Sequence, residues 1–164
     1  MIFKIKKGNH YSNRFLFKIL NLFNGNPRMS NYVIFDDTAI YVDETIDKFD
    51  VNKLFGFSIG FHHNNSYRFG WNSFDGKIHI YAYAYVNKKR IIDEICVIES
   101  NKEYVLTINL KSDKCLFSVI DENDNIKQMV IDSPHKNIIG YKLWPYFGGN
   151  KTAPKKISIN LFEH

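Results

Sequence analysis

The chain lacks several features that mark particular classes of protein. It has only two cysteines in 164 residues, Cys96 and Cys115, and no Cys-x-x-Cys pair. This excludes a disulfide framework and favours two buried, reduced thiols, with one bridge between neighbouring strands as the open alternative.

No apolar run approaches the length of a membrane span, and residues 1–15 do not have the features of a signal peptide. We therefore expect a cytoplasmic or virion-associated protein with no membrane partner.

Charge of one sign is not concentrated anywhere along the chain. The 22 Lys and Arg residues exceed the 17 Asp and Glu residues by five, but they are dispersed and form no basic stripe. Nucleic acid is thus an unlikely partner, and the charge is more simply explained by solubility. With 45% hydrophobic residues, four prolines and nine glycines, the composition is that of an ordinary globular protein. We expect one domain over residues 1–164.

Motifs for cofactors, metals and nucleophilic catalysis are also missing. There is no glycine-rich phosphate loop and no recognisable Ser-His-Asp or Cys-His arrangement. Adjacent His62 and His63 would point to opposite sides of a strand, so they do not form a shared metal site. Residues 121–132 place oxygen ligands at calcium-loop offsets, but Ile126 stands where glycine is required, which favours a hairpin turn. The sequence therefore predicts no cofactor, no metal and no motif-defined catalytic residue.

Long helical periodicity is nearly absent, and alternating runs bounded by turn residues recur along the chain. Asp75-Gly76 is the strongest hairpin signal among these turns. Residues 14–24 fit either a strand or a helix, and we favour a strand because the rest of the chain is β. The sequence predicts an all-β fold, an antiparallel sandwich of two sheets or a jelly roll. The expected strands are 31–36, 38–43, 54–62, 66–72, 77–86, 90–98, 103–111, 115–121, 126–132, 138–147 and 155–162.

The stretch KIHIYAYAYV, residues 77–86, alternates aliphatic side chains with polar rings. In a sandwich, each strand sends alternate residues into the core and out of it. The aliphatic set is therefore expected to face inward, and the ring set outward. The inward set is Ile78, Ile80, Ala82, Ala84 and Val86; the outward set is His79, Tyr81, Tyr83 and Tyr85.

Three other strands show a similar division. We expect one apolar set at Phe55, Phe57, Ile59 and Phe61, a second at Tyr67, Phe69 and Trp71, and a third at Tyr141, Leu143 and Phe147. The opposite sets then contain His62, Arg68, Lys142, Trp144 and Tyr146. Pro145 weakens the last assignment, because proline within a strand indicates an edge or a bulge that swaps the faces.

If these strands share one sheet, its outer face carries rings, imidazoles and cations. Rings stack on the apolar face of a sugar, and the polar groups bond its hydroxyls or a carboxylate. The alternative is a tyrosine ladder that stabilises a solvent-facing sheet without any ligand. The glycan-binding interpretation predicts a ligand site at His62, Arg68, His79, Tyr81, Tyr83, Tyr85, Lys142, Trp144 and Tyr146.

The stretches LFGFSIGFHHNNSYRFGWN, GKIHIYAYAYVNKKR and GYKLWPYFGGNKTAPKKISINL resemble the concanavalin A-like jelly rolls, a group that includes lectins, glucanases and polysaccharide lyases. They are also similar to small uncharacterised bacterial and phage-encoded proteins with that expected fold. The resemblance implies a concanavalin A-like jelly roll with a glycan or polysaccharide partner.

The resemblance extends only in part to enzymatic motifs. The E-x-D-x-E arrangement of the glucanases is missing. Alginate-type lyases carry Gln-(Ile/Val)-His and Tyr-Phe-Lys-x-Gly, where this chain has Lys-Ile-His at 77–79 and Tyr-Phe-Gly-Gly at 146–149. The resemblance implies that Arg68, His79 and Tyr146 would neutralise a carboxylate, take a proton and give one to the leaving oxygen.

Three hypotheses follow. The first is a non-catalytic, lectin-like jelly-roll module that binds a glycan. The second is a structural protein, such as a phage-particle component, whose aromatic face packs on other chains of an assembly. The third is a polysaccharide lyase that acts by β-elimination.

Overall fold

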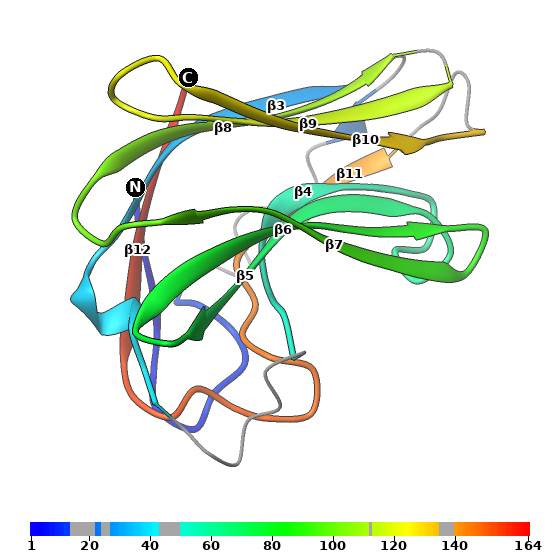
Figure 1. Ribbon diagram of the computed structural model, residues 1–164. Helices are drawn as coiled ribbons and strands as arrows, with labels where there is room; N and C mark the ends of the chain where they lie inside the picture. The colour runs from blue at the N-terminus through cyan, green and yellow to red at the C-terminus, as the bar shows by residue number, and fades with distance from the viewer. Residues whose placement is uncertain (14–21, 24–26, 43–49, 112, 135–139) are drawn as a thin grey trace.

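The described part of the chain folds as two antiparallel sheets of six strands each, which face one another in Figure 1. This computed structural model describes residues 1–13, 22–23, 27–42, 50–111, 113–134 and 140–164. The first sheet has the order β1 (Ile2–Ile5), β12 (Ile157–Glu163), β3 (Arg28–Phe35), β8 (Glu103–Lys111), β9 (Lys114–Ile120) and β10 (Ile126–Asp132). The second has the order β2 (Leu22–Phe23), β11 (Gly140–Leu143), β4 (Asn52–Ile59), β5 (Ser66–Phe74), β6 (Lys77–Val86) and β7 (Lys89–Ile98).

The predicted fold class, an all-β sandwich of two antiparallel sheets, is confirmed. Strand β6 occupies the predicted residues, and its hairpin with β5 turns at Asp75 and Gly76, both of which have positive φ. Strand β1 was not anticipated from the sequence. It pairs with β12 over four residues and extends the first sheet.

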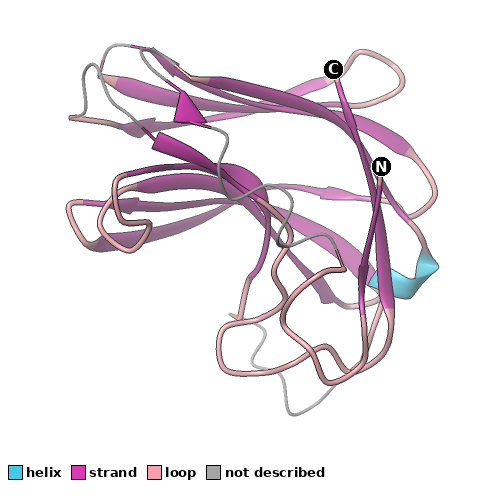
Figure 2. Ribbon diagram, turned by 180° about the vertical axis from the view of Figure 1, so that it is seen from behind, coloured by secondary structure: helices cyan, strands magenta, loops and turns pink. Residues whose placement is uncertain are grey.

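The predicted strand at 38–43 is wrong: its described residues, 38–42, contain no strand. Residues Asp37–Ala39 form a short 3-10 helix, drawn in cyan in Figure 2. Asp36 caps this turn, because its carboxylate accepts a hydrogen bond of 2.9 Å from the backbone N–H of Thr38. Local capping by an acidic side chain therefore overrides the alternating pattern. The ambiguous segment 14–24 lies outside the described residues except for β2.

The core fills the space between the sheets and is rich in aromatic rings. Trp71 on β5 packs against Phe35 on β3, with ring centroids 5.1 Å apart, and Phe69 meets Phe117 of β9 edge to face at 5.3 Å. These contacts join the two sheets through pairs of rings. The inward set of β6 is confirmed for its first four members, which are fully buried, and Val86 is half-buried against the same core.

The apolar set of β4 is confirmed for three members and wrong for the fourth. Phe55, Phe57 and Ile59 are buried, whereas 59% of Phe61 is exposed. The strand ends at Ile59, and Gly60 follows with φ of +65°. A left-handed residue at this point ends the two-residue alternation, so Phe61 no longer belongs to the core face.

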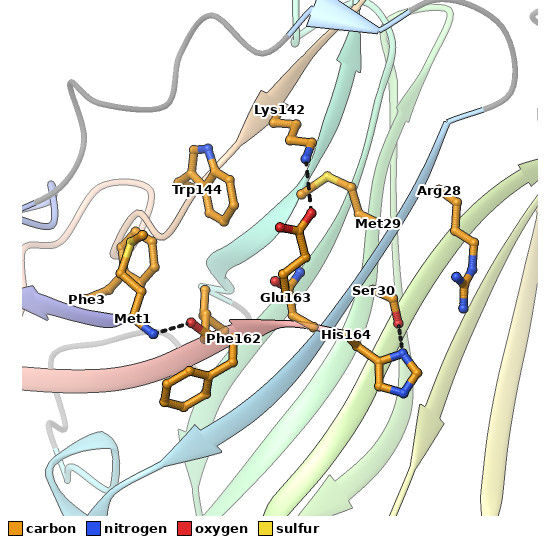
Figure 3. Close-up of a pocket in the computed structure, with 12 residues that line it drawn as sticks. Met1, Phe3, Arg28, Met29, Ser30, Lys142, Trp144, Phe162, Glu163 and His164 are labelled. Carbon is orange, nitrogen blue, oxygen red and sulfur yellow. Dashed lines mark hydrogen bonds and ion pairs between the residues drawn. The ribbon is translucent and has the colours of Figure 1, made fainter.

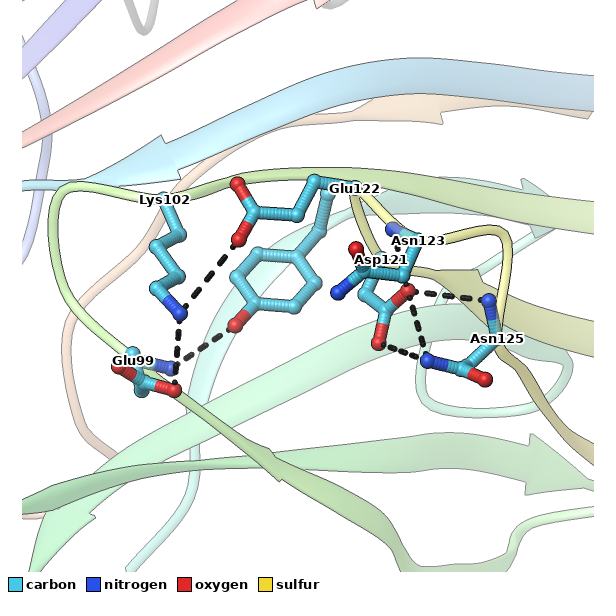
Figure 4. Close-up of polar contacts among 7 residues, drawn as sticks. Glu99, Lys102, Asp121, Glu122, Asn123 and Asn125 are labelled. Carbon is cyan, nitrogen blue, oxygen red and sulfur yellow. Dashed lines mark hydrogen bonds and ion pairs between the residues drawn. The ribbon is translucent and has the colours of Figure 1, made fainter.

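The turn between β9 and β10 is a hairpin turn, as expected (Figure 4). The Asp121 carboxylate accepts hydrogen bonds from the backbone N–H groups of Asn123 and Asn125, at 2.8 and 3.0 Å. Its oxygens therefore bond within the turn. Lys102 lies in the turn between β7 and β8. It links that turn to this one through its ion pairs with Glu99 and Glu122.

Neither cysteine forms a disulfide. Cys115 is buried and Cys96 half-buried, and burial raises the pKa of the Cys96 thiol to about 11. Among the described residues, no helix is long and apolar enough to cross a membrane.

Candidate functional site: a tyrosine-lined cationic groove

Strand pairing in the second sheet aligns polar side chains on its outer face. Directly paired residues of neighbouring strands point to the same side of a sheet. Tyr85 on β6 pairs with Ser66 on β5, which pairs with Ser58 on β4, which in turn pairs with Tyr141 on β11. This gives one row of side chains across the outer face of four strands.

The adjacent row contains the only arginine of β5. Tyr83 pairs with Arg68, Arg68 with Gly56, and Gly56 with Leu143. Gly56 has no side chain, so Arg68 lies in a depression between Tyr83 and the β11 edge. The register therefore places the guanidinium group beside the Tyr83 ring, with Gly56 and Leu143 on its other side.

These rows border a groove of about 840 Å³, a volume typical of ligand-binding sites. Its described lining contains one carboxylate, Asp50, against several cations. The cations are Lys53, Arg68 and Arg90; the rings are Tyr11, His62, His63, Tyr83, Tyr85, Tyr141 and Tyr146. Lys142 and Trp144 border the groove, but their side chains are turned to the inner side of the sheet. The groove is thus cationic and aromatic, and we refer to it below as the cationic groove.

Arg68 is the most deeply placed cation of the groove, with 9% of its surface exposed. Its Nη2 donates to the main-chain oxygen of Trp144 at 3.4 Å, and its Nε is buried without a hydrogen-bond partner. No carboxylate of the described residues forms an ion pair with it. Burial lowers its pKa to about 10, while the nearby tyrosines oppose this shift, so it is charged at neutral pH. A desolvated cation without a counter-ion is unfavourable, and an anion in the groove would relieve this cost.

Lys53 supplies a second, half-buried cation next to Arg68. Its ammonium group donates to the main-chain oxygen of Gly148 at 2.9 Å and lies 5.0 Å from the centre of the Tyr83 ring. Burial is the main cause that lowers its pKa to about 8, and the charge of Arg68 adds to the effect, partly opposed by Asp50. Lys53 therefore titrates in a range where Arg68 remains charged.

One end of the groove is formed by two histidines and two tyrosines. The Nδ1 atom of His62 lies 3.0 Å from the hydroxyl of Tyr141, and the two imidazole centroids are 4.4 Å apart. Burial, followed by the charge of His63, lowers the pKa of His62, so its imidazole is neutral at pH 7. His63 in turn meets the Tyr85 ring edge to face. This end can both donate and accept protons.

The opposite wall is held by a bridge between the C-terminal segment and β4. Tyr146 exchanges two main-chain hydrogen bonds with Lys53, at 2.8 and 2.9 Å. Its ring stacks on His10 at 5.2 Å and meets Tyr11 edge to face at 5.1 Å. These contacts fix the ring, which gives the groove a rigid aromatic wall.

The structure brings the side chains of five of the nine predicted site residues to this groove, turns those of two bordering residues to the inner side of the sheet, and leaves two residues outside. His79 lies outside and pairs with Glu94 at 3.1 Å, and the Tyr81 hydroxyl donates to Asn72 at 3.2 Å. Both lie further along the outer face of β6. The five are His62, Arg68, Tyr83, Tyr85 and Tyr146, and the two that border the groove are Lys142 and Trp144.

The faces expected for β11 are reversed. Lys142 pairs with Phe57, a core residue, and the ring of Trp144 stacks on buried Phe3 at 5.6 Å, so both side chains lie on the inner side of the sheet. Tyr141 and Leu143, expected inside, pair with residues of the outer face. This strand alternates polar and apolar groups on both sides, so its pattern alone does not reveal which face is buried.

Several groove residues were missed from the sequence. Lys53 precedes a register shift between β4 and β5, and a bulge of this kind has no signal in a two-residue pattern. Asp50, Tyr11 and Arg90 reach the groove from loops and from a strand end. Within the described residues, no three His, Cys, Asp or Glu side chains gather in a way that could hold a metal ion.

No family model and no curated protein sequence matches the chain. Solved structures match at low identity. The alginate lyase AlyC3 superposes with a TM-score of 0.62 at 13% identity, over 99% of this chain and 74% of that one. The alginate lyase from Klebsiella pneumoniae gives 0.56 at 9% identity, over 86% of this chain. A functionally unknown protein from Saccharomyces cerevisiae gives 0.52 at 8% identity, over 87% of this chain and 72% of that one.

The match with the Klebsiella pneumoniae enzyme covers 59% of that enzyme's length. At such identities the likeness concerns the fold alone. The chain therefore has the jelly-roll sandwich fold found in these two alginate lyases.

Proposed function

We propose that the chain binds an acidic polysaccharide, a polymer of uronic acids, in the cationic groove without cleaving it. The observation that carries this proposal is Arg68, a buried guanidinium at the groove floor with no carboxylate partner among the described residues. A planar guanidinium can bind a carboxylate with two parallel hydrogen bonds. A uronate residue would supply that missing carboxylate.

The remaining lining suits the rest of such a sugar. Tyr83, Tyr85 and Tyr146 present rings beside Arg68, and each stacked ring contributes about 0.5–1.5 kcal/mol beyond simple burial. The excess of cations over the single carboxylate Asp50 favours a polyanion over a neutral polymer. The shared fold with two alginate lyases supports the same ligand class, because alginate is a polyuronate.

The proposal is tested by calorimetric titration with oligouronates and with neutral oligosaccharides of equal length. We expect binding of the acidic series alone, with an affinity that falls as salt is added because the contacts are ionic. Equal affinity for both series, or no binding of either, would reject an acidic-glycan site.

Binding should weaken as the pH rises from 7 to 9. Lys53 loses its charge around its pKa of about 8, whereas Arg68 stays protonated up to about 10 and uronate carboxylates stay ionised throughout. Loss of one of two neighbouring cations should lower the affinity roughly three- to tenfold. The check is a pH series of titrations at constant ionic strength. The K53M variant should bind more weakly at pH 7 and show a flat profile, and a sloping profile in K53M would assign the effect to another group.

A second candidate is β-elimination, and the His62–Tyr141 contact of 3.0 Å favours it. The trio that the sequence suggested is not assembled, because His79 is held by Glu94 outside the groove. Neutral His62, close to Arg68, is a better placed base. It would take the proton next to the uronate carboxylate, Tyr141 would protonate the departing glycosidic oxygen, and a carbon–carbon double bond would form.

Incubation with polyuronates decides between the two. If the groove only binds, no absorbance of an unsaturated product appears, even after long incubation at high protein concentration. Formation of such a product, with its loss in both H62A and Y141F, would establish the lyase instead.

A further inference from the structure

A second cavity opens at the edge of the sandwich, where β11 of one sheet faces β12 and β3 of the other. It has a volume of about 550 Å³, within the range of small-molecule sites, and Figure 3 shows the side chains around it. We propose that this cavity, the inter-sheet pocket, binds a single neutral sugar residue. The pocket lies on the inner side of the sheet and shares Lys142 and Trp144 with the border of the cationic groove. The proposal does not depend on the function proposed for that groove.

The floor of the inter-sheet pocket is apolar and rigid. Phe3, Met29 and Leu161 line it and are 1%, 5% and 3% exposed. The Trp144 indole also lines it and lies nearly parallel to the Phe3 ring, with 5.6 Å between centroids and 10° between planes. Stacking on a core residue holds the indole in place. A fixed aromatic plane above an apolar floor suits the apolar face of a pyranose ring.

A buried amide gives the pocket its polar recognition element. Asn31 lies on the same face of β3 as the core residues Met29 and Val33 and is 5% exposed. Its side chain lines the pocket, and within the described part of the chain its amide takes part in no side-chain hydrogen bond. An amide that faces a cavity on an otherwise apolar strand face, and that no neighbouring side chain bonds, is available to a ligand. An amide both donates and accepts, which matches a sugar hydroxyl.

Opposite charges stand at the rim of the pocket. Glu163 pairs with Asn31 across the strands, and its carboxylate lies 4.0 Å from the Lys142 ammonium, at the limit of an ion pair. Figure 3 shows the two groups reaching toward one another beside Trp144. Such a pair offers an acceptor and a donor to neighbouring hydroxyls without favouring a net charge. The cationic groove, by contrast, has an excess of cations, so the two sites should select different ligands.

Trp144 is unsuitable as the test residue because it belongs to both sites. Its ring lines the inter-sheet pocket, while its main-chain oxygen accepts the hydrogen bond from Arg68. The informative changes are N31L, which removes the amide at similar volume, and E163Q, which alters an exposed side chain. Y85F is the matched control in the cationic groove.

The probes are methyl glucoside, methyl galactoside and methyl mannoside, titrated into a chain with no residues added at either end. The end residues Met1 and His164 line the pocket, so a tag would interfere. Binding is followed by saturation-transfer NMR and by tryptophan fluorescence. The chain has two tryptophans and Trp71 is fully buried, so a spectral change reports on Trp144.

We expect at least one glycoside to bind in the millimolar range, N31L to weaken it about tenfold, and E163Q to weaken it about threefold, as expected for single lost hydrogen bonds. Y85F should leave it unchanged. Absence of binding by all three glycosides would overturn the proposal, and so would binding that neither N31L nor E163Q weakens. If N31L proves unstable, E163Q alone decides, because its side chain lies at the surface.

Discussion

Replacement of Arg68 by methionine should abolish the binding of acidic oligosaccharides while leaving the fold intact. The buried guanidinium is the group that would pair with the ligand carboxylate, and loss of one partner of a buried charge pair costs about 2–5 kcal/mol of binding free energy. This corresponds to a loss of affinity of roughly 30-fold to several thousand-fold, measurable by calorimetry.

The free protein should tolerate this change. Arg68 has no ion-pair partner among the described residues, so its charge is buried without compensation, and an apolar side chain of similar length removes that cost. We expect the melting temperature of R68M to equal or exceed that of the wild type. A large drop in melting temperature would instead show that Arg68 supports the sheet.

Two further variants separate charge from geometry. R68K keeps a cation but loses the planar pair of donors, so its affinity should lie between those of the wild type and R68M. R90Q removes an exposed cation from the rim, where a charge contributes at most about 1 kcal/mol. If R90Q lost as much affinity as R68M, the ligand would be held by the overall charge of the groove and not by a specific guanidinium.

Replacement of Gly56 by alanine should have the largest effect on stability among small substitutions near the groove. A methyl group at this position would lie 2.0 Å from the main-chain oxygen of Tyr67 and 2.6 Å from Cα of Arg68. Both are backbone atoms, so the β4–β5 pair must move apart. Overpacking of this kind costs about 1–3 kcal/mol or more, or roughly 2–12 °C in melting temperature.

Because Arg68 is part of the backbone that must move, G56A should also weaken binding. G149A is the matched control, since its added methyl group would meet only the Asp50 carboxylate, the end of a side chain, at 3.0 Å. Thermal unfolding and titration of both variants check the prediction. Equal melting temperatures for G56A and the wild type would show that the close approach at Gly56 is not required.

Strand β6 shows how far a sequence pattern can be used in this protein. Ile78, Ile80, Ala82 and Ala84 alternate strictly with polar rings, and the structure buries all four. The pattern is informative because only one of its two sets can fill a core. The same logic predicted the buried residues of β5, and so the sandwich as a whole.

Strand β11 shows where that logic fails. Both of its alternating sets contain an apolar or aromatic member, so the burial of either set is compatible with the sequence. The choice is made by pairing with β4, which sets Lys142 beside Phe57 and Tyr141 beside Ser58. The side chain of Trp144 consequently belongs to the inter-sheet pocket, although its spacing suggested the outer face.

The composition of the candidate site depended on contacts between distant segments. Lys53 and Tyr146 are 93 residues apart in sequence and are joined by main-chain hydrogen bonds, whereas His79 lies outside the groove, beside Glu94. Such contacts follow from register shifts and loop paths, which no local pattern encodes.

By itself, the amino-acid order determined that this protein is an antiparallel sandwich with tyrosines and an arginine on an outer face, because strand periodicity and side-chain polarity are local properties. Only the tertiary structure decided which of those groups meet in one groove and which rings turn inward, because register, strand order and bulges depend on the packing of the whole chain.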